Sequence, residues 1–178
     1  MLVLTVQSYR NIQKIYNESY IPDLRKSRYA YLSTRYLRGY MYNIESLSKK
    51  TGIGYRYGLD SCMWGWVKNP YLPFYYNSGN IPFKDRMYAV FFELNESESV
   101  LSDYDKYCRY VENESNENFF IDSVDQADCV QCCFWGINPK NIKLIVELDK
   151  LRGMNISEML NCNKLNDSKF LFNSYAVG

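Results

Sequence analysis

Residues 88–107 read YAVFFELNESESVLSDYDKY, and this stretch carries the clearest structural signal of the chain. Its first part, 88–94, is a run of apolar and aromatic residues, which predicts a β-strand buried on both faces. The polar residues that follow predict a turn, and LSDYD at 101–105 opens a second element. The hydroxyl of Ser102 and the carboxylates of Asp103 and Asp105 therefore gather where a strand passes into a helix.

Two interpretations of this junction stay open. In the first, Ser102 is the N-cap and an acid three residues on completes a capping box, so that both side chains bond free amides. Acids at a helix start also suit the helix dipole. In the second, Asp103 or Asp105 faces a cleft and accepts hydrogen bonds from a sugar hydroxyl or a basic group. A side chain that local amides satisfy is a cap, whereas one that points into a pocket is free to bind a ligand.

The remaining periodicity predicts a single α+β domain over residues 1–150, with a C-terminal extension at 151–178 that either packs on the domain or trails from it. Strands are expected at 2–7, 62–67, 87–94, 130–135 and 143–148. Helices are expected at 9–17, 29–49 and 103–111, the first of them capped by Ser8. Residues 69–83 are expected to form an aromatic-rich loop, and the acidic segment 112–128 a mobile excursion. An N-terminal strand and helices followed by a mostly antiparallel sheet is an α+β order.

The sequence contains no histidine, which limits the kinds of catalytic and metal site that the protein can have. None of the 178 residues is His, which excludes His-based acid–base catalysis, Ser–His and Cys–His nucleophile pairs and His-containing zinc sites. No apolar run is long enough for a transmembrane helix, and the N-terminal residues lack the basic start and cleavage site of a signal peptide. We therefore expect a cytoplasmic protein with no membrane association.

The six cysteines are expected to be reduced thiols in that compartment. The segment CVQCC at 129–133 contains one C-x-x-C, but a zinc site needs about four ligands and no second C-x-x-C exists. In a strand, Gln131 would share one face with Cys129 and Cys133, and Cys132 would lie on the other. We interpret these thiols as small core residues and expect no metal site. A redox or metal-binding function through them is the third hypothesis for this chain.

The charge is unevenly distributed along the sequence. Residues 1–58 carry ten Lys or Arg against three Asp or Glu, whereas residues 93–128 carry two against eleven. Two solvated faces of opposite sign would explain this pattern. A basic surface that holds a phosphate-bearing ligand, beside an acidic rim, would explain it as well.

Aromatic and amide side chains supply the other candidates for a binding site. Trp64 and Trp66 would share one strand face, where they form either part of the core or a stacking platform. The loop aromatics, Tyr71 among them, would suit stacking on a base or ring. Gln7 ends the first strand and could present a bidentate donor and acceptor to a ligand.

The order of these motifs resembles that of an uncharacterised bacterial family of similar length. Its T-I-Q, W-A-W, L-S-D-x-D and V-Q-x-x-F-W blocks correspond to segments 5–8, 63–66, 101–105 and 130–135, and the resemblance spans roughly residues 2–148. The family name itself implies no activity.

The chain also resembles, more distantly, the DNA- or RNA-modifying ADP-ribosyltransferases of the DarT type. That family begins with a strand that ends in a polar residue, and it closes with a strand whose glutamate is catalytic. Gln7, Ser102 and Asp103, and Gln131 would occupy corresponding places, with NAD as the implied cofactor. Cys133 stands at the position of the catalytic glutamate, and Gln7 replaces the usual His or Arg. The resemblance therefore implies a split α+β fold with a nucleotide-sized cleft more than it implies transferase activity.

Two function hypotheses from different classes follow. In the first, the protein binds a nucleotide or nucleic-acid end in a cleft, and Asp103 or Asp105 would orient a ribose hydroxyl or act as a base if the site is catalytic. The residues that would line this cleft are Gln7, Trp64, Trp66, Ser102, Asp103, Asp105 and Gln131. In the second, it is a non-enzymatic protein from a mobile element or phage, whose acidic 93–128 region contacts a protein of a host defence or toxin system.

Overall fold

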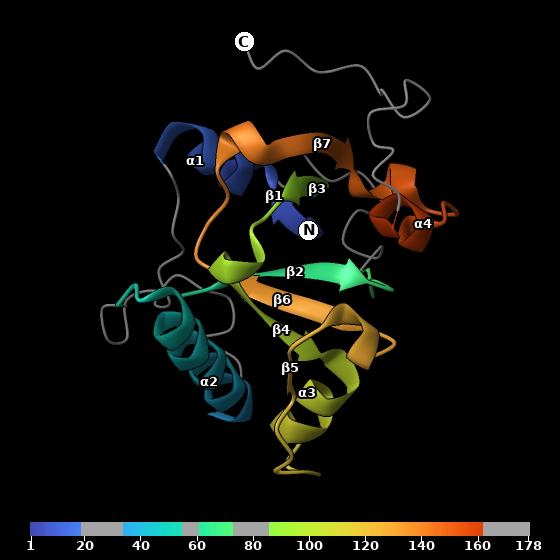
Figure 1. Cartoon of the computed structure of the whole chain (residues 1–178). Coiled ribbons are helices and arrows are strands. Elements are labelled where there is room, and N and C mark those ends of the chain that lie inside the picture. Colours follow the sequence, from blue (N-terminus) through green and yellow to red (C-terminus); the bar gives the residue numbers. More distant parts are fainter. Residues whose placement is uncertain (19–33, 55–60, 73–85, 162–178) are drawn as a thin grey trace.

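A seven-stranded antiparallel sheet forms the centre of the fold, which is α+β as expected (Figure 1). The computed structural model describes residues 1–18, 34–54, 61–72 and 86–161. The strand order is β5–β4–β6–β2–β1–β3–β7, so the first strand of the chain lies inside the sheet. The start of the expected second helix, loop residues 73–83 and the extension beyond 161 lie outside the described residues.

The five expected strands are confirmed, each to within one residue at its ends. The strands are β1 Leu2–Ser8, β2 Met63–Lys68, β3 Met87–Glu93, β4 Ser99–Asp103, β5 Phe120–Ile121, β6 Val130–Phe134 and β7 Ile142–Glu147. The α-helices are α1 Tyr9–Glu18, α2 Thr34–Thr51, α3 Tyr104–Val111 and α4 Ile156–Asn161. Short 3-10 helices are η5 Glu96–Glu98, η6 Val124–Gln126, η7 Pro139–Asn141 and η8 Leu148–Leu151.

The stretch that opened the sequence analysis contains an additional strand. Residues 95–100 were expected to be a turn, but β4 begins at Ser99 and pairs with both β5 and β6. The expected mobile excursion at 112–128 is also wrong in part, because Phe119 is completely buried and β5 joins the sheet edge. One buried aromatic ring and two pairing residues therefore hold this acidic segment against the sheet.

The register separates the residues of the sheet into two faces. Directly opposed residues of antiparallel strands share a face, and neighbours along a strand alternate. Leu4 opposes Trp66, and Trp66 opposes Gln131, so these three side chains lie on one face. Val3 and Cys132 lie on the other, in the core cluster that α1 covers through Ile12 and Ile15.

Three helices cover the face that carries Trp66. Helix α2 contacts β4 and β6, α3 contacts β4, and α4 contacts β1 and β2. Figure 1 shows α2 and α3 next to the β4–β5 end of the sheet, and α1 next to β1. In α2, Tyr40, Ile44 and Leu47 recur at helical spacing, so their side chains lie on the buried side of the helix. Each of the three residues is at most 4% exposed.

The described part of the C-terminal extension packs on the same face. Leu151, Met159 and Leu160 are buried in one cluster with Leu4 and Phe91 of the central strands. Residues 151–161 are thus part of the hydrophobic core and not a trailing segment, as far as the chain is described.

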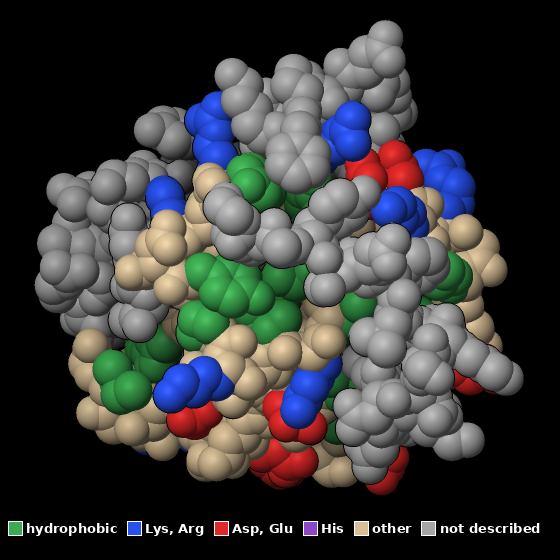
Figure 2. Space-filling view, turned by 90° about the horizontal axis from the view of Figure 1, so that it is seen from above, with side chains coloured by type: hydrophobic (Ala, Val, Ile, Leu, Met, Phe, Trp, Pro, Cys, Tyr) green, Lys and Arg blue, Asp and Glu red, His purple; other side chains and the backbone are tan. Residues whose placement is uncertain are grey.

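Charges of both signs lie close together on the surface. Figure 2 shows one face with hydrophobic side chains in its middle and Lys or Arg next to Asp or Glu at several places around them. Ion pairs join Lys143 to Glu93 and Lys106 to Glu117, at 3.0 and 2.7 Å. Part of the acidic stretch is therefore neutralised by lysines from other elements. No helix among the described residues has the length and apolar character needed to cross a membrane.

Candidate functional site

Trp64 and Trp66 lie under helix α3, and each contacts the ring of one tyrosine of that helix. The Trp64 ring is 5.1 Å from that of Tyr107, and the Trp66 ring is 4.9 Å from that of Tyr104. The two tryptophans are two residues apart on a strand, and the two tyrosines are three residues apart on a helix. The distances along these elements are similar, so each tyrosine can lie over one tryptophan. Trp64 also contacts Tyr40 of α2 at 5.8 Å and belongs to the core beneath that helix. Trp66 packs against the separate core cluster that contains Leu4 and Phe91, and both tryptophans are partly buried.

Beside Trp66, two buried polar side chains have an unpaired oxygen. Ser102 opposes Gln131 across β4 and β6, and Gln131 opposes Trp66 across β6 and β2. Ser102 is 1% and Gln131 8% exposed, yet no described residue bonds Ser102 Oγ or Gln131 Oε1. We call Trp66, Tyr104, Ser102 and Gln131 the aromatic site. Buried polar atoms nearly always have a partner, so this pair is unusual.

Asp103 caps helix α3 with one of its two carboxylate oxygens. Its Oδ1 accepts hydrogen bonds from the backbone N–H groups of Asp105 and Lys106, at 3.0 and 3.2 Å. The N-cap is thus Asp103 and not Ser102, because β4 continues through Ser102 before the chain turns into α3. Asp105 is exposed in the first helical turn.

Gln7 does not join the aromatic site. Its side chain donates to Thr5 Oγ1 at 2.9 Å and accepts from Asn11 Nδ2 at 3.0 Å, so local groups satisfy it. Thr5 and Gln7 alternate with Leu4, which places them on the face opposite to Trp66. The structure therefore brings together Trp66, Ser102 and Gln131 and separates them from Gln7.

Tyr71 extends the aromatic site toward solvent. It is 70% exposed, and its ring lies 6.5 Å from that of Tyr104 at an angle of 20°. The turn before it is anchored by Asn69, whose amide donates to the Asp128 carbonyl at 2.7 Å and accepts from the Ser157 hydroxyl at 2.8 Å. This anchoring holds Tyr71 close to Tyr104.

Burial shifts the titration of the groups around Tyr104. It raises the pKa of the Tyr104 phenol, and the neighbouring Cys108 raises it further. Burial, followed by the charges of Asp105 and Asp103, raises the pKa of Cys129 to about 11. Tyr104 and Cys129 are therefore neutral hydrogen-bonding groups at physiological pH.

Cys133 is part of the hydrophobic core. It is fully buried, and its thiol lies 3.5 Å from the Asn43 Oδ1 atom of α2. Burial and the adjacent Cys133 also raise the pKa of Cys62. The alternation expected for 129–133 is confirmed, because Cys132 and Cys133 belong to clusters on opposite faces. Within the described residues, no three His, Cys, Asp or Glu side chains are grouped so as to hold a metal ion.

Comparison of the chain with protein-family models, curated proteins and solved structures gave no match. Tyr104 of the aromatic site, and Tyr107 next to it on α3, were not selected from the sequence. Their spacing on the short helix that follows Asp103 was the available signal, since it places both rings on one side. Which strand they would cover depended on the strand order.

Proposed function

We propose that the protein binds a nucleotide, or the end of a nucleic-acid strand, at the aromatic site. The observation that carries this proposal is the pair of buried, unpartnered oxygens of Ser102 and Gln131, which lie opposite each other on β4 and β6. Leaving one such atom without a partner costs roughly 1–3 kcal/mol. Two of them beside partly buried aromatic rings favour a site in which a ligand supplies the missing hydrogen bonds.

The residue types suit the parts of a nucleotide. The Gln131 amide offers an acceptor and two donors, which matches the edge of a nucleobase. Trp66 and Tyr104, extended by Tyr71, offer rings on which a base can stack. The Ser102 hydroxyl can both donate to and accept from a sugar hydroxyl.

Binding is better supported than group transfer. Cys133 packs against Asn43 and carries no carboxylate that could stabilise an oxocarbenium-like centre. Asp103 uses Oδ1 to cap α3, and no described residue donates to its second oxygen. That oxygen is therefore the carboxylate atom we assign to a ribose hydroxyl. The resemblance to ADP-ribosyltransferases makes NAD the first candidate ligand.

The interaction hypothesis has less support from the described residues. Glu93 and Glu117, both in the acidic stretch, already pair with lysines of the same chain. The other nine acidic residues of this stretch form no ion pair with a described residue, so contact with a basic partner stays the alternative function.

Isothermal titration calorimetry with NAD, ADP-ribose, ATP and a short single-stranded oligonucleotide tests the proposal. We expect at least one probe to bind, and Gln131→Leu to weaken it by roughly tenfold or more, since an acceptor in the site is lost. Gln13→Leu is the matched control, because Gln13 is exposed on α1. Absence of binding to all four probes, or equal affinity of the two variants, would overturn the proposal.

A further inference from the structure

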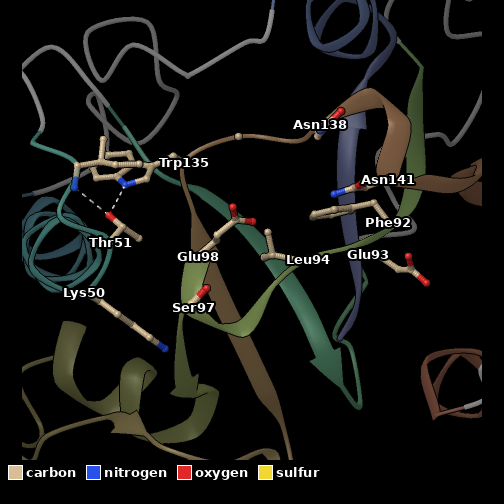
Figure 3. Close-up of a pocket in the computed structure, with 12 residues that line it drawn as sticks. Lys50, Thr51, Phe92, Glu93, Leu94, Ser97, Glu98, Trp135, Asn138 and Asn141 are labelled. Atoms are coloured by element: carbon tan, nitrogen blue, oxygen red, sulfur yellow. Dashed lines mark hydrogen bonds between the residues drawn. The ribbon is translucent and has the colours of Figure 1, made fainter.

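A cavity lies at the C-terminal end of α2. It has a volume of about 440 Å³ and is enclosed by the last turn of α2, by η5 and by the connection between β6 and β7 (Figure 3). This volume falls within the range of pockets that take small molecules. None of the residues of the aromatic site lines it.

One wall of this pocket is apolar and fixed in place. Trp135 is 9% exposed, and its indole N–H donates to Thr51 Oγ1 at 3.0 Å (Figure 3). The Thr51 hydroxyl in turn donates to the Leu47 carbonyl at 2.8 Å, which ties the ring to the end of α2. Phe92 and Leu94, which are 1% and 6% exposed, supply further apolar surface.

Two opposite charges line the pocket without pairing. Glu98 and Lys50 are exposed, and neither side chain forms a hydrogen bond or an ion pair with a described residue or with the other. Figure 3 shows the Glu98 carboxylate directed into the space between Trp135 and Phe92, and Lys50 extending from α2 on the side of Ser97. Glu93 points away from that space and pairs with Lys143.

We propose that this pocket binds a small zwitterion with an apolar group, which is the chemistry of a free α-amino acid. Glu98 would hold the ammonium group, and Lys50 the carboxylate. The apolar side chain would lie against Trp135 and Phe92. A phosphate is a poorer fit, because Glu98 would repel it and one lysine would face it alone. The Asn141 amide, directed toward Glu98 in Figure 3, adds a polar contact for the ligand.

The test follows the three tryptophan indole N–H signals by ¹H–¹⁵N NMR, with each signal assigned by a Trp→Phe variant. Trp135 reports on this pocket, and Trp64 and Trp66 report on the aromatic site, so the two proposals are tested separately. The probes are L-phenylalanine and its two halves, phenethylamine and 3-phenylpropionate. We expect L-phenylalanine to shift the Trp135 signal saturably and about tenfold more tightly than either half, because each charge has a counter-charge.

Charge variants show which end of the ligand each residue holds. Glu98→Gln should weaken the binding of L-phenylalanine and phenethylamine but not that of 3-phenylpropionate. Lys50→Met should weaken the binding of L-phenylalanine and 3-phenylpropionate but not that of phenethylamine. Glu96→Gln and Lys49→Met are the controls, since both residues are exposed next to these positions and do not line the pocket. The proposal is overturned if the Trp135 signal does not saturate, if only Trp64 or Trp66 responds, or if Glu98→Gln equals its control.

Discussion

Ser102 and Gln131 oppose each other on β4 and β6, and each has a buried oxygen that no described residue bonds. Ser99, three residues earlier on β4, is equally buried, but its hydroxyl donates to the Glu96 carbonyl at 3.3 Å. The two serines therefore form a natural pair for measuring what an unsatisfied hydroxyl does to this sheet.

Ser102→Ala should raise the free energy of unfolding by about 1 kcal/mol in the absence of ligand, because it removes a buried polar atom without a partner. Ser99→Ala should lower it by about 1 kcal/mol, because it removes the hydrogen bond from the hydroxyl to the Glu96 carbonyl. Urea unfolding followed by circular dichroism measures both. Equal destabilisation by the two substitutions would mean that a partner, such as a buried water molecule, satisfies Ser102.

Asp103→Ala should lower the free energy of unfolding by about 1 kcal/mol, since the first turn of α3 loses its cap. Asp103→Asn should retain the stability, because an Asn side chain caps a helix about as well. Asp105 does not cap α3, so Asp105→Asn should change stability by no more than about 0.5 kcal/mol. Thermal unfolding of the three variants separates these effects.

The double variant D103N D105N tests the ligand role of the same residues. It keeps the cap and removes both carboxylates, so it should fold as the parent chain does and lose affinity for the nucleotide. Unchanged affinity would restrict Asp103 to its structural role.

Gly65→Ala should destabilise the chain by about 1–3 kcal/mol through overpacking. A Cβ at this position would overlap the Val3 side chain on β1, and it would lie 3.2 Å from a ring carbon of Phe134. Gly54→Ala should have little effect, because no atom lies within 4 Å of the added Cβ. Chemical denaturation of the two variants checks the difference, and similar midpoints would show that Val3 can move aside.

Stability should fall in alkaline solution. The pKa of Cys129 is about 11 in the folded chain against an ordinary value of 9.0, and burial also raises that of Cys132. As the pH rises above the ordinary value, the unfolded chain loses these protons first. The contribution of Cys129 is therefore complete below about pH 9 and is lost as the pH rises toward about 11.

Melting temperatures measured across this interval should fall less steeply for Cys129→Ser than for the parent chain. The serine hydroxyl can still donate to the Asn69 carbonyl, which the thiol now contacts at 3.1 Å. Identical slopes for the two chains would show that Cys129 does not carry the expected share of the alkaline loss.

The elements that the sequence predicted well are those with local signals. Strand β3 followed from Val90, Phe91 and Phe92, all of which are at most 1% exposed. Strand β4 was missed because its sequence, SVLSD, is mostly polar, and its pairing with β6, whose residues lie 27 to 35 positions later, defines it. The local sequence pattern predicted α3 but not its N-cap residue. The N-cap is Asp103 because β4 continues up to that residue.

The candidate site divides in the same way. Alternation along β2 correctly placed Trp64 and Trp66 on one face. The proximity of Ser102, Gln131 and Trp66 depends on the order β4–β6–β2, which no segment of sequence contains. Gln7 was grouped with them because the face on which a strand end lies is set by its register with distant strands. The pocket beside Trp135 joins three distant segments and had no sequence signal.

The place of β1 between β2 and β3 has a consequence for folding. Strand β1 is central, and it can pair with both neighbours only once the chain extends through β3, since Thr5 pairs with Val90. Such distant pairings slow folding relative to helical domains of the same size. Deleting β1 would divide the sheet into β5–β4–β6–β2 and β3–β7, so the N-terminal residues decide whether the two halves become one folded unit.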